Sequence, residues 1–198
     1  MIYSYVLKND GGYAPNVKGG ICTLATCKPK IRKHANVGDW IIGFGSKRTG
    51  YQNKIVYMMK VSKKLTFKEY NELCLKKYPI KIPKKRTDIG DCQYYYKNGE
   101  LIQRPGCHTY DNIKIDISGE YVLIADQFYF FGTKAIETPI ELKPIIKTGV
   151  GHKSQSNKPY ETVFNNWISN NAPFTIPTDA KHIDYLSSCS KKKQTILC

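Results

Sequence analysis

Apolar and polar positions alternate in blocks along the chain, and the clearest block covers residues 37–75. A Gly-Asp turn precedes an apolar segment from Trp40 to Phe44, and a polar loop separates it from a second apolar segment, Ile55 to Val61. Short apolar runs bounded by turn residues are typical of buried strands. The residues that follow have helical period, and Thr66 with Glu69 three positions later predicts an N-cap. The block therefore predicts strand, loop, strand and helix in this order.

The rest of the chain contains weaker signals of the same kind. Asn98-Gly99 between two β-prone runs predicts a hairpin with a type I′ turn, because both residues adopt left-handed backbone conformations easily. Pro29 suits the first turn of a short basic helix. We expect further strands at 2–7 and 20–27 and in two runs within 121–131, and helices at 28–35, 139–147 and 160–170.

Length and cysteine content narrow the class of protein. With 198 residues the chain is large enough for one proper hydrophobic core. We predict one domain over residues 1–177 and a polar, basic tail over 178–198. The seven cysteines are odd in number and irregularly spaced, and we see neither a secretory segment nor a run long enough to span a membrane. These features predict a cytoplasmic protein with reduced thiols that does not contact a membrane.

The charge of the chain favours a polyanionic partner. The formal net charge is +15, which is large for this length. Only four of the 31 basic residues are arginines, and the chain is also rich in Ile, Asn and Tyr. Codon usage in an AT-rich genome produces the same skew, so the lysine excess alone leaves both a functional basic face and a merely solvated surface open. The arginines carry more information because a planar guanidinium suits bidentate recognition of phosphates and bases. They are Arg32, Arg48, Arg86 and Arg104.

Four separated motifs give the chain a family resemblance. They are Cys22-Thr-Leu-Ala-Thr-Cys-Lys-Pro29, Val37-Gly-Asp-Trp-Ile-Ile-Gly43, the run 126–132, and Gly149-Val-Gly-His-Lys153. Together they resemble the second type of nucleotide modification associated domain, over Met1 to about Pro177. This family occurs in phages, bacteria and mobile elements near systems that alter DNA bases, so the resemblance implies a role linked to modified nucleotides.

A looser likeness, confined to residues 37–70, is to the PUA-like barrels of the EVE and ASCH groups, which include readers of modified bases. Taken with the strand order, it implies an α+β fold. We expect a mixed, mostly antiparallel β-barrel of PUA-like type with flanking helices.

Candidate binding residues are basic, aromatic or able to read a base edge. Lys28 and Arg32 on the basic helix could meet phosphates, although a solvated helix face would look the same. A base flipped into a barrel mouth needs an aromatic face and a few polar groups. Trp40 between apolar neighbours is also a typical core residue. The full set of predicted nucleotide-binding residues is Asp10, Thr23, Lys28, Arg32, Trp40, Tyr57, Arg86 and Tyr94.

Two further groups could perform acid–base chemistry. His152 and Lys153 end a glycine-spaced loop that either approaches a phosphate or is a flexible turn. Arg86, Asp91 and His108 flank the predicted hairpin, and could act together or simply fix a loop. The candidate catalytic residues are thus His152, Lys153, Asp91 and His108, and a Cys–His nucleophilic pair from distant positions stays open.

Metal and cofactor signatures are absent from the sequence. There is no Cys-x-x-Cys, and Cys22 and Cys27 are too far apart for a usual zinc knuckle. Neither a zinc-deaminase signature, nor a Walker A motif, nor a Gly-x-Ser-x-Gly elbow occurs. We expect no metal and no cofactor.

Three functions remain compatible with these residues. The first is a non-enzymatic module that recognises a modified base or nucleotide in DNA or RNA, and it has the most support. The second is an enzyme that modifies a nucleotide or base with a pair such as His152 and Lys153. The third is a phage or mobile-element protein that docks a host factor. The sequence leaves the oligomeric state open.

Overall fold

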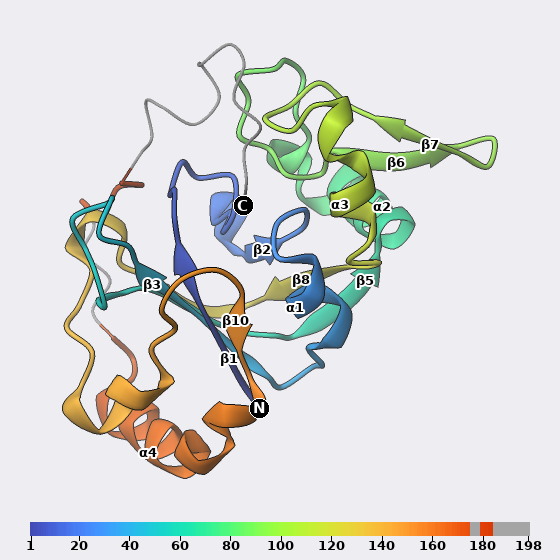
Figure 1. Cartoon of the computed structure of the whole chain (residues 1–198). Coiled ribbons are helices and arrows are strands. Elements are labelled where there is room, and N and C mark those ends of the chain that lie inside the picture. Colours follow the sequence, from blue (N-terminus) through green and yellow to red (C-terminus); the bar gives the residue numbers. More distant parts are fainter. Residues whose placement is uncertain (175–178, 184–198) are drawn as a thin grey trace.

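The computed structural model describes residues 1–174 and 179–183, which form three β-sheets with helices on the outside (Figure 1). The strands are β1 (Ile2–Leu7), β2 (Cys22–Leu24), β3 (Trp40–Gly45), β4 (Ile55–Lys60), β5 (Lys63–Thr66), β6 (Tyr94–Lys97), β7 (Glu100–Gln103), β8 (Tyr121–Ala125), β9 (Gln127–Phe130) and β10 (His152–Lys153). The α-helices are α1 (Pro29–His34), α2 (Phe67–Lys77), α3 (Ile113–Ile117) and α4 (Glu161–Asn171). Short 3₁₀ helices are η1 (Lys18–Gly20), η2 (Pro79–Lys81), η3 (Tyr110–Asn112), η4 (Gly132–Lys134), η5 (Ile140–Ile145) and η6 (Gln155–Tyr160).

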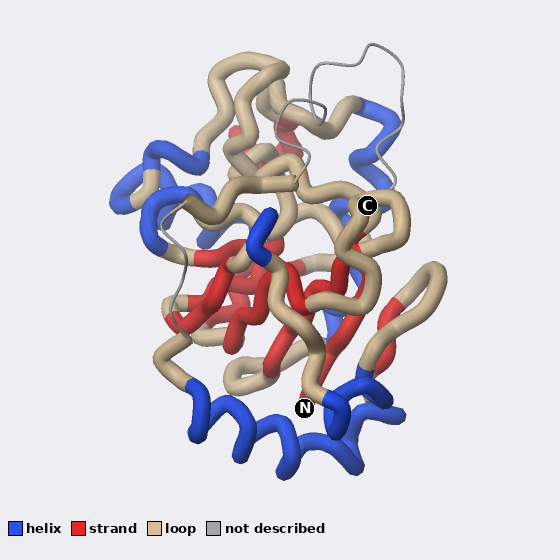
Figure 2. The backbone as a smooth tube through the Cα atoms, turned by 90° about the vertical axis from the view of Figure 1, so that its left-hand side faces the viewer, coloured by secondary structure: helices blue, strands red, loops and turns tan. Residues whose placement is uncertain are grey.

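The largest sheet has the strand order β10-β1-β3-β4-β9, and a second sheet has the order β2-β8-β5. The pair β1–β3 is parallel, whereas the other strand pairs are antiparallel. The strands β6 and β7 form a separate hairpin. Figure 2 shows the strands in the centre of the molecule and helices around them.

Two stretches of chain contribute to both large sheets. Only Val61 and Ser62 separate β4 from β5, and only Asp126 separates β8 from β9. The Ser62 amide donates to the carbonyl of Ile124 (2.7 Å), which keeps the two stretches paired through the bend. Side chains from both sheets meet in the main core, which includes Tyr5 and Leu24. A second core lies where η5 and α4 cover the largest sheet.

The mixed α+β class with mostly antiparallel pairing is confirmed. Barrel closure is not: the strands within residues 1–174 and 179–183 form separate open sheets. The physical reason lies in the bends at Val61–Ser62 and Asp126, which fold the chain into two sheets instead of curling one sheet onto itself.

The strongest local signals are confirmed. Thr66 accepts a hydrogen bond from the Glu69 amide, and the Glu69 carboxylate accepts one from the Thr66 amide, which completes the capping box of α2. Asn98 (φ 51°) and Gly99 (φ 84°) form the left-handed turn between β6 and β7.

Two predicted elements are shorter than the sequence indicates. The strand predicted at 20–27 covers only β2, because the chain turns after Leu24. The helix predicted at 139–147 is the 3₁₀ helix η5, which contains Pro144, a residue without the N–H that an α-helix needs. Strand β5 was not predicted: its residues carry three polar side chains and one Leu, without an apolar run.

Candidate functional site

Helix α1 lies near β10 and β1 (Figure 1). Six basic side chains of this region are close enough to repel one another. The Lys28 ammonium lies 4.8 Å from the centroid of the Tyr5 ring. Tyr5 is paired with His152 across the sheet, so both side chains project from the same face. The His152 ring also lies 5.8 Å from that of Tyr3. We call this group the cation cluster; its members are Lys8, Lys28, Lys30, His34, Lys147 and His152.

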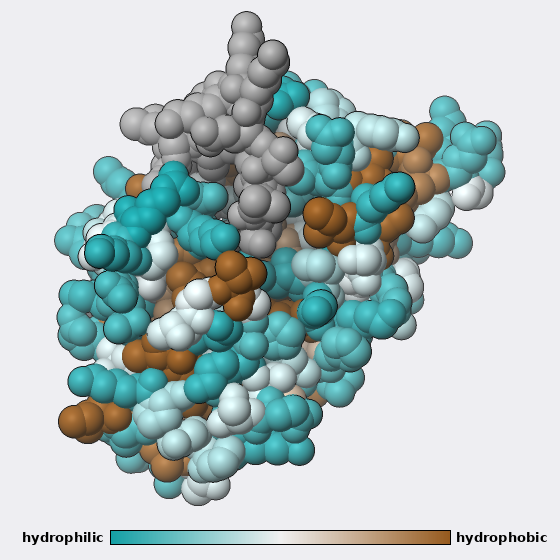
Figure 3. Space-filling view, in the orientation of Figure 1, coloured by the Kyte–Doolittle hydropathy of each residue, from teal (hydrophilic) through white to brown (hydrophobic). Residues whose placement is uncertain are grey.

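The members of the cation cluster disfavour each other's charge. Burial, together with a smaller effect of the nearby Lys8 ammonium, lowers the pKa of Lys28 to about 8. Burial also lowers the pKa of His152, with added repulsion from Lys30, His34, Lys28 and Lys147. An anion bound here would reverse both effects, because an opposite charge favours the protonated form. The surface on this side of the molecule is mostly hydrophilic (Figure 3).

No carboxylate among residues 1–174 and 179–183 neutralises the cation cluster. The ion pairs of exposed lysines in this part of the chain lie elsewhere: Lys33 with Glu120, Lys54 with Glu137 and Lys134 with Asp179. The Lys28 ammonium also has no hydrogen bond to any described residue, and it lies over the ring of Tyr5. A partly buried cation without a partner is unfavourable unless a ligand supplies the negative charge.

Arg32, predicted to meet phosphates from the same helix, lies in the interior instead. Its guanidinium donates to the carbonyl oxygens of Cys27 (2.9 Å), Tyr121 (2.6 Å) and Thr26 (2.8 Å), and also to that of Asp116. This placement corrects the expectation of a solvated phosphate ligand, because the donors of Arg32 are used to join α1 to neighbouring loops. The short helix exposes Lys30, Lys33 and His34 and buries Arg32.

Thr23 and Asp91 meet in a buried network that sequence reasoning did not assemble. Asp91 accepts hydrogen bonds from Thr23 (2.5 Å) and from the Tyr70 hydroxyl (2.7 Å). The Lys81 ammonium donates to the Thr23 hydroxyl (2.9 Å) and to the side-chain oxygen of Asn16 (3.0 Å). Burial raises the pKa of Asp91 and lowers that of Lys81, while each charge partly offsets this effect on the other. The network fixes loops to the second sheet.

The burial of Lys81 could not be predicted from the sequence. It lies between Ile80 and Ile82 in a basic segment, and nothing in its spacing distinguishes it from the exposed lysines. Its burial follows from the tertiary placement of η2 beside η1.

His108 belongs to a different network from Asp91. Its Nδ1 lies 2.7 Å from the Asp116 carboxylate, which also accepts a hydrogen bond from the Tyr94 hydroxyl (2.6 Å). Arg86 is exposed. The predicted trio of Arg86, Asp91 and His108 is therefore not brought together, and Tyr94 contributes its hydroxyl to this network, with its ring buried in the core.

Like Tyr94, the other two aromatic residues of the predicted nucleotide-binding set lie in the core. Trp40 is 5% exposed, and its ring packs edge-on against Phe164 of α4 at 5.4 Å. Tyr57 is fully buried, with its hydroxyl 2.7 Å from that of Tyr5. This packing favours the core alternative for Trp40, because a base could stack on it only after α4 moved.

His152 and Lys153 do not form an acid–base pair. They are consecutive in β10, so their side chains leave opposite faces of the sheet. Lys153 pairs with Ser4 in the register, and its ammonium donates to the Pro144 carbonyl on the η5 side. Of the two residues, only His152 belongs to the cation cluster.

Asp10 is bound by the C-terminal segment of the chain. Its carboxylate lies 2.7 Å from Nδ1 of His182 and accepts the Ile183 amide (3.1 Å). Residues 179–183 belong to the predicted polar tail; residues 184–198 lie outside the described part. A ligand that used Asp10 would have to share it with His182 or displace it.

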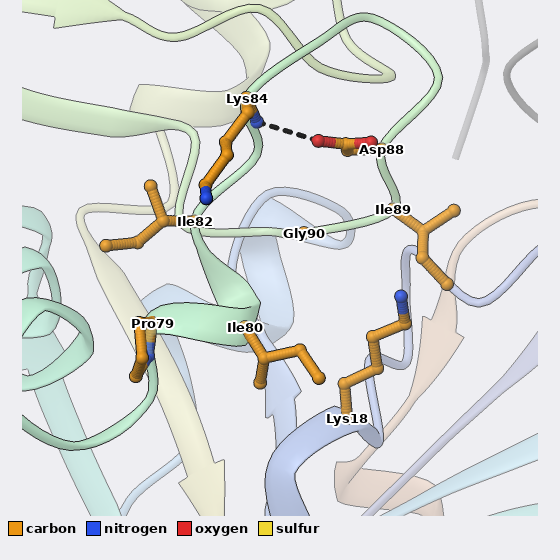
Figure 4. A pocket seen from close by; sticks show the side chains of 8 residues that line it. All are labelled: Lys18, Pro79, Ile80, Ile82, Lys84, Asp88, Ile89 and Gly90. Carbon is orange, nitrogen blue, oxygen red and sulfur yellow. Dashed lines mark hydrogen bonds between the residues drawn. The ribbon is translucent and has the colours of Figure 1, made fainter.

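A surface pocket of about 390 Å³ lies between η1, η2 and the loop before β6 (Figure 4). Ile80 and Lys18 lie on one side of it, and Ile89 and Gly90 on the other. The Asp88 carboxylate accepts the backbone N–H groups of Lys84 (2.8 Å) and Lys85, and it brings a negative charge to the rim. The pocket is thus less suited to an anion than the cation cluster is. Its lining residues are Lys18, Pro79, Ile80, Ile82, Lys84, Asp88, Ile89 and Gly90.

Three features bear on the remaining sequence expectations. Cys22, Cys74 and Cys92 are free, whereas Cys27 and Cys107 are disulfide-bonded, which corrects the expectation that all thiols are reduced. In the described ranges, no three His, Cys, Asp or Glu side chains are arranged to hold a metal ion. No helix in the same ranges has the length and apolar character that crossing a membrane requires.

Comparison with known proteins gives one match. Neither a curated protein nor a solved structure matches the chain. The family described as nucleotide modification associated domain 2 matches residues 1–183, which is more than nine tenths of the sequence and includes both α1 and β10. The chain therefore belongs to the nucleotide modification associated domain 2 family.

Proposed function

We propose that this protein binds a nucleotide or a nucleic-acid strand, with phosphate groups in the cation cluster, and recognises a modified base. The observation that carries the proposal is the Lys28 ammonium. It is partly buried, its pKa is lowered to about 8, and it has no acidic or hydrogen-bonding partner among the described residues. A phosphate oxygen would supply the missing charge and acceptor.

Two broader properties support the same ligand class. The net charge of +15 attracts polyanions, and the family name links the domain to nucleotide modification. Phosphate contacts fix the position of a strand but carry no base information. The modified base is therefore proposed from the family name. Its recognition would depend on rings at the cluster, such as the half-buried ring of His152 and the ring of Tyr3 beside it.

Binding of labelled single-stranded DNA, followed by fluorescence anisotropy at several salt concentrations, tests the proposal. Strands with and without 5-hydroxymethylcytosine are compared. We expect affinity to fall steeply with salt, and Lys28→Ala to weaken binding roughly five- to tenfold and to reduce the salt slope by about one.

The matched control is Lys76→Ala, which removes the same charge from an exposed position on α2. It should leave affinity within about twofold of the parent protein. Equal losses of affinity in the two variants would mean that Lys28 contributes only to the overall charge of the protein and not to a specific binding site. That result would overturn the proposal.

A further inference from the structure

The segment 179–183 lies against a buried carboxylate that is distant from it in the sequence. Asp10 is fully buried, and both of its side-chain oxygens are bonded to this segment. Oδ1 lies 2.7 Å from Nδ1 of His182, and Oδ2 accepts the backbone N–H of Ile183 (3.1 Å). Since a carboxylate can only accept, Nδ1 of His182 is the donor. Asp10 therefore binds two neighbouring N–H groups, one on each oxygen.

The His182 ring also packs against an aromatic side chain. Its centroid lies 4.5 Å from that of Phe130 in β9. Gly12 leaves space for the ring, because a Cβ at that position would lie 2.9 Å from Cδ2 of His182. A flat ring on an aromatic side chain, with its N–H edge bonded to a polar group, is the arrangement in which proteins bind a single nucleobase.

The pattern of donors indicates which base fits the Asp10 carboxylate. Guanine has two adjacent donors on its Watson–Crick edge, N1–H and the N2 amino group, and a carboxylate can accept both, one on each oxygen. Adenine and cytosine instead present a ring nitrogen that accepts beside their amino group, and this nitrogen would face a carboxylate oxygen. The N3–H of uracil and thymine lies between two carbonyl oxygens. The carboxylate therefore favours a guanine-type base.

The remaining contacts of the segment are of a kind that a ligand can replace. The Thr133 amide donates to the Lys181 carbonyl (2.9 Å), and Asp179 forms an ion pair with Lys134 (3.1 Å). Both partners of this ion pair are exposed, so it contributes little to stability. The side chain of Ile183 packs on the main core. A base that binds Asp10 would restore the hydrogen bonds lost there.

We propose that Asp10 and Phe130 form a binding site for a guanine-type base, and that residues 179–183 occupy this site in the structure. The His182 ring takes the place of the base, and the Ile183 amide takes the place of its second donor. A guanine base binds when the segment moves away. Its apparent affinity is therefore reduced by the fraction of molecules in which the site is open.

This site is separate from the phosphate site of the proposed function. A base at Asp10 needs no phosphate, and the nucleoside guanosine carries none. Guanosine binding therefore tests the base site alone. Lys28→Ala should weaken DNA binding and leave guanosine affinity within about twofold, because the cation cluster binds charge and guanosine is neutral. The two proposals can thus fail independently.

Equilibrium dialysis of labelled guanosine against the full-length chain measures the competition. His182→Ala removes the ring and one donor from the segment, so we expect it to tighten guanosine binding about tenfold. The matched control is Lys181→Ala, which removes an exposed side chain from the same segment and keeps its backbone hydrogen bonds. It should change affinity less than about twofold.

Selectivity among nucleosides tests the role of Asp10. Inosine lacks the N2 amino group, and we expect it to bind His182→Ala at least about tenfold more weakly than guanosine does. In Asp10→Asn the carboxamide offers one donor and one acceptor, which match O2 and N1–H of xanthosine. The preference for guanosine over xanthosine should therefore reverse in this variant, with thermal unfolding as the check that it folds.

Two results would overturn the proposal. One is a guanosine affinity that is the same in the parent protein and in His182→Ala, including the case in which neither binds. The other is adenosine binding to His182→Ala as tightly as guanosine does, because the Asp10 carboxylate would then not read the base.

Discussion

The interior basic side chains and the cation cluster use the same residue types in opposite ways. Arg32 and Lys81 are fully buried, yet each donates to several oxygens of the chain. Lys28 is less deeply buried and donates to none of the described residues. The comparison shows that burial of a cation does not by itself indicate a binding site. A binding site is indicated when the buried cation has no acceptor within the chain and can therefore bind an acceptor on a ligand.

Electrostatics distinguishes the two regions in the same way. Around Lys81 the opposing charge of Asp91 partly offsets the effect of burial, whereas around Lys28 and His152 the neighbouring charges add to it. Folding therefore leaves unfavourable energy in the cation cluster that an anion can relieve. In the interior networks, Asp91 and the oxygen acceptors of the chain already relieve part of this energy.

The largest expected effect is on stability when an interior cation is removed. Arg32→Met leaves carbonyl oxygens of Thr26, Cys27, Asp116 and Tyr121 without their donor. We expect the free energy of unfolding to fall by about 3–5 kcal/mol in urea denaturation, since each unsatisfied buried group costs about 1–3 kcal/mol. A loss below about 1 kcal/mol would contradict the structural role of Arg32.

A second stability effect is expected at Lys81. Lys81→Met removes the donor to Thr23 and Asn16 and leaves Asp91 without a nearby cation. We predict a loss of about 2–4 kcal/mol in the same assay. Lys84→Met, at an exposed position on the same segment, should change stability by less than about 0.5 kcal/mol. Similar values for the two variants would show that Lys81 is not the interior anchor.

A pH dependence of ligand affinity is expected from the cation cluster. The pKa of free Lys28 is about 8, and a bound phosphate raises it. Affinity should thus be full below that value and be lost as pH rises through 8 toward the pKa of the complex. Anisotropy titrations between about pH 7 and 9.5 measure this loss, for which we expect roughly a tenfold change.

Lys28→Arg is the matched control for this dependence. A guanidinium stays charged over the whole range, so the variant should bind with nearly constant affinity. If affinity declines with pH in the same way in both proteins, a group other than Lys28 titrates. The other lysines of the cation cluster are Lys8, Lys30 and Lys147.

The smallest expected effect distinguishes the two residues of β10. Burial and the neighbouring cations lower the pKa of His152, so its ring becomes charged and strengthens anion binding only in acid; measured there, His152→Ala should weaken binding roughly threefold. Lys153→Ala removes a charge from the opposite face and should leave affinity unchanged. A larger effect of Lys153→Ala would place the ligand on the η5 side of the sheet instead.

The elements that were predicted correctly are those that depend on residues close together in the sequence. The capping box of α2 and the Asn98-Gly99 turn depend on residues within four positions of each other, and both are as predicted. The bends at Val61–Ser62 and Asp126 depend on pairing between distant segments, and so the open two-sheet arrangement could not be predicted.

The candidate site was predictable only in part for the same reason. Lys28 and His152 were both singled out, but from separate motifs, and their convergence arises from the pairing of Tyr5 with His152. Asp91 and His108 were chosen for their chemistry, whereas their partners Lys81 and Asp116 had no local signal. Arg32 and Trp40 were predicted to contact a ligand because of their residue types. Both lie in the interior, because α1 and α4 pack them there.

The side-chain pKa of Lys28, followed by NMR of ¹³C-labelled lysine, tests the central claim most directly. In the free protein we expect a value near 8, well below the ordinary value of about 10.4. Saturation with a short single-stranded DNA should raise it by at least one unit, because a phosphate then faces the ammonium. An ordinary pKa in the free protein, or a lowered one that the DNA leaves unchanged, would contradict the account.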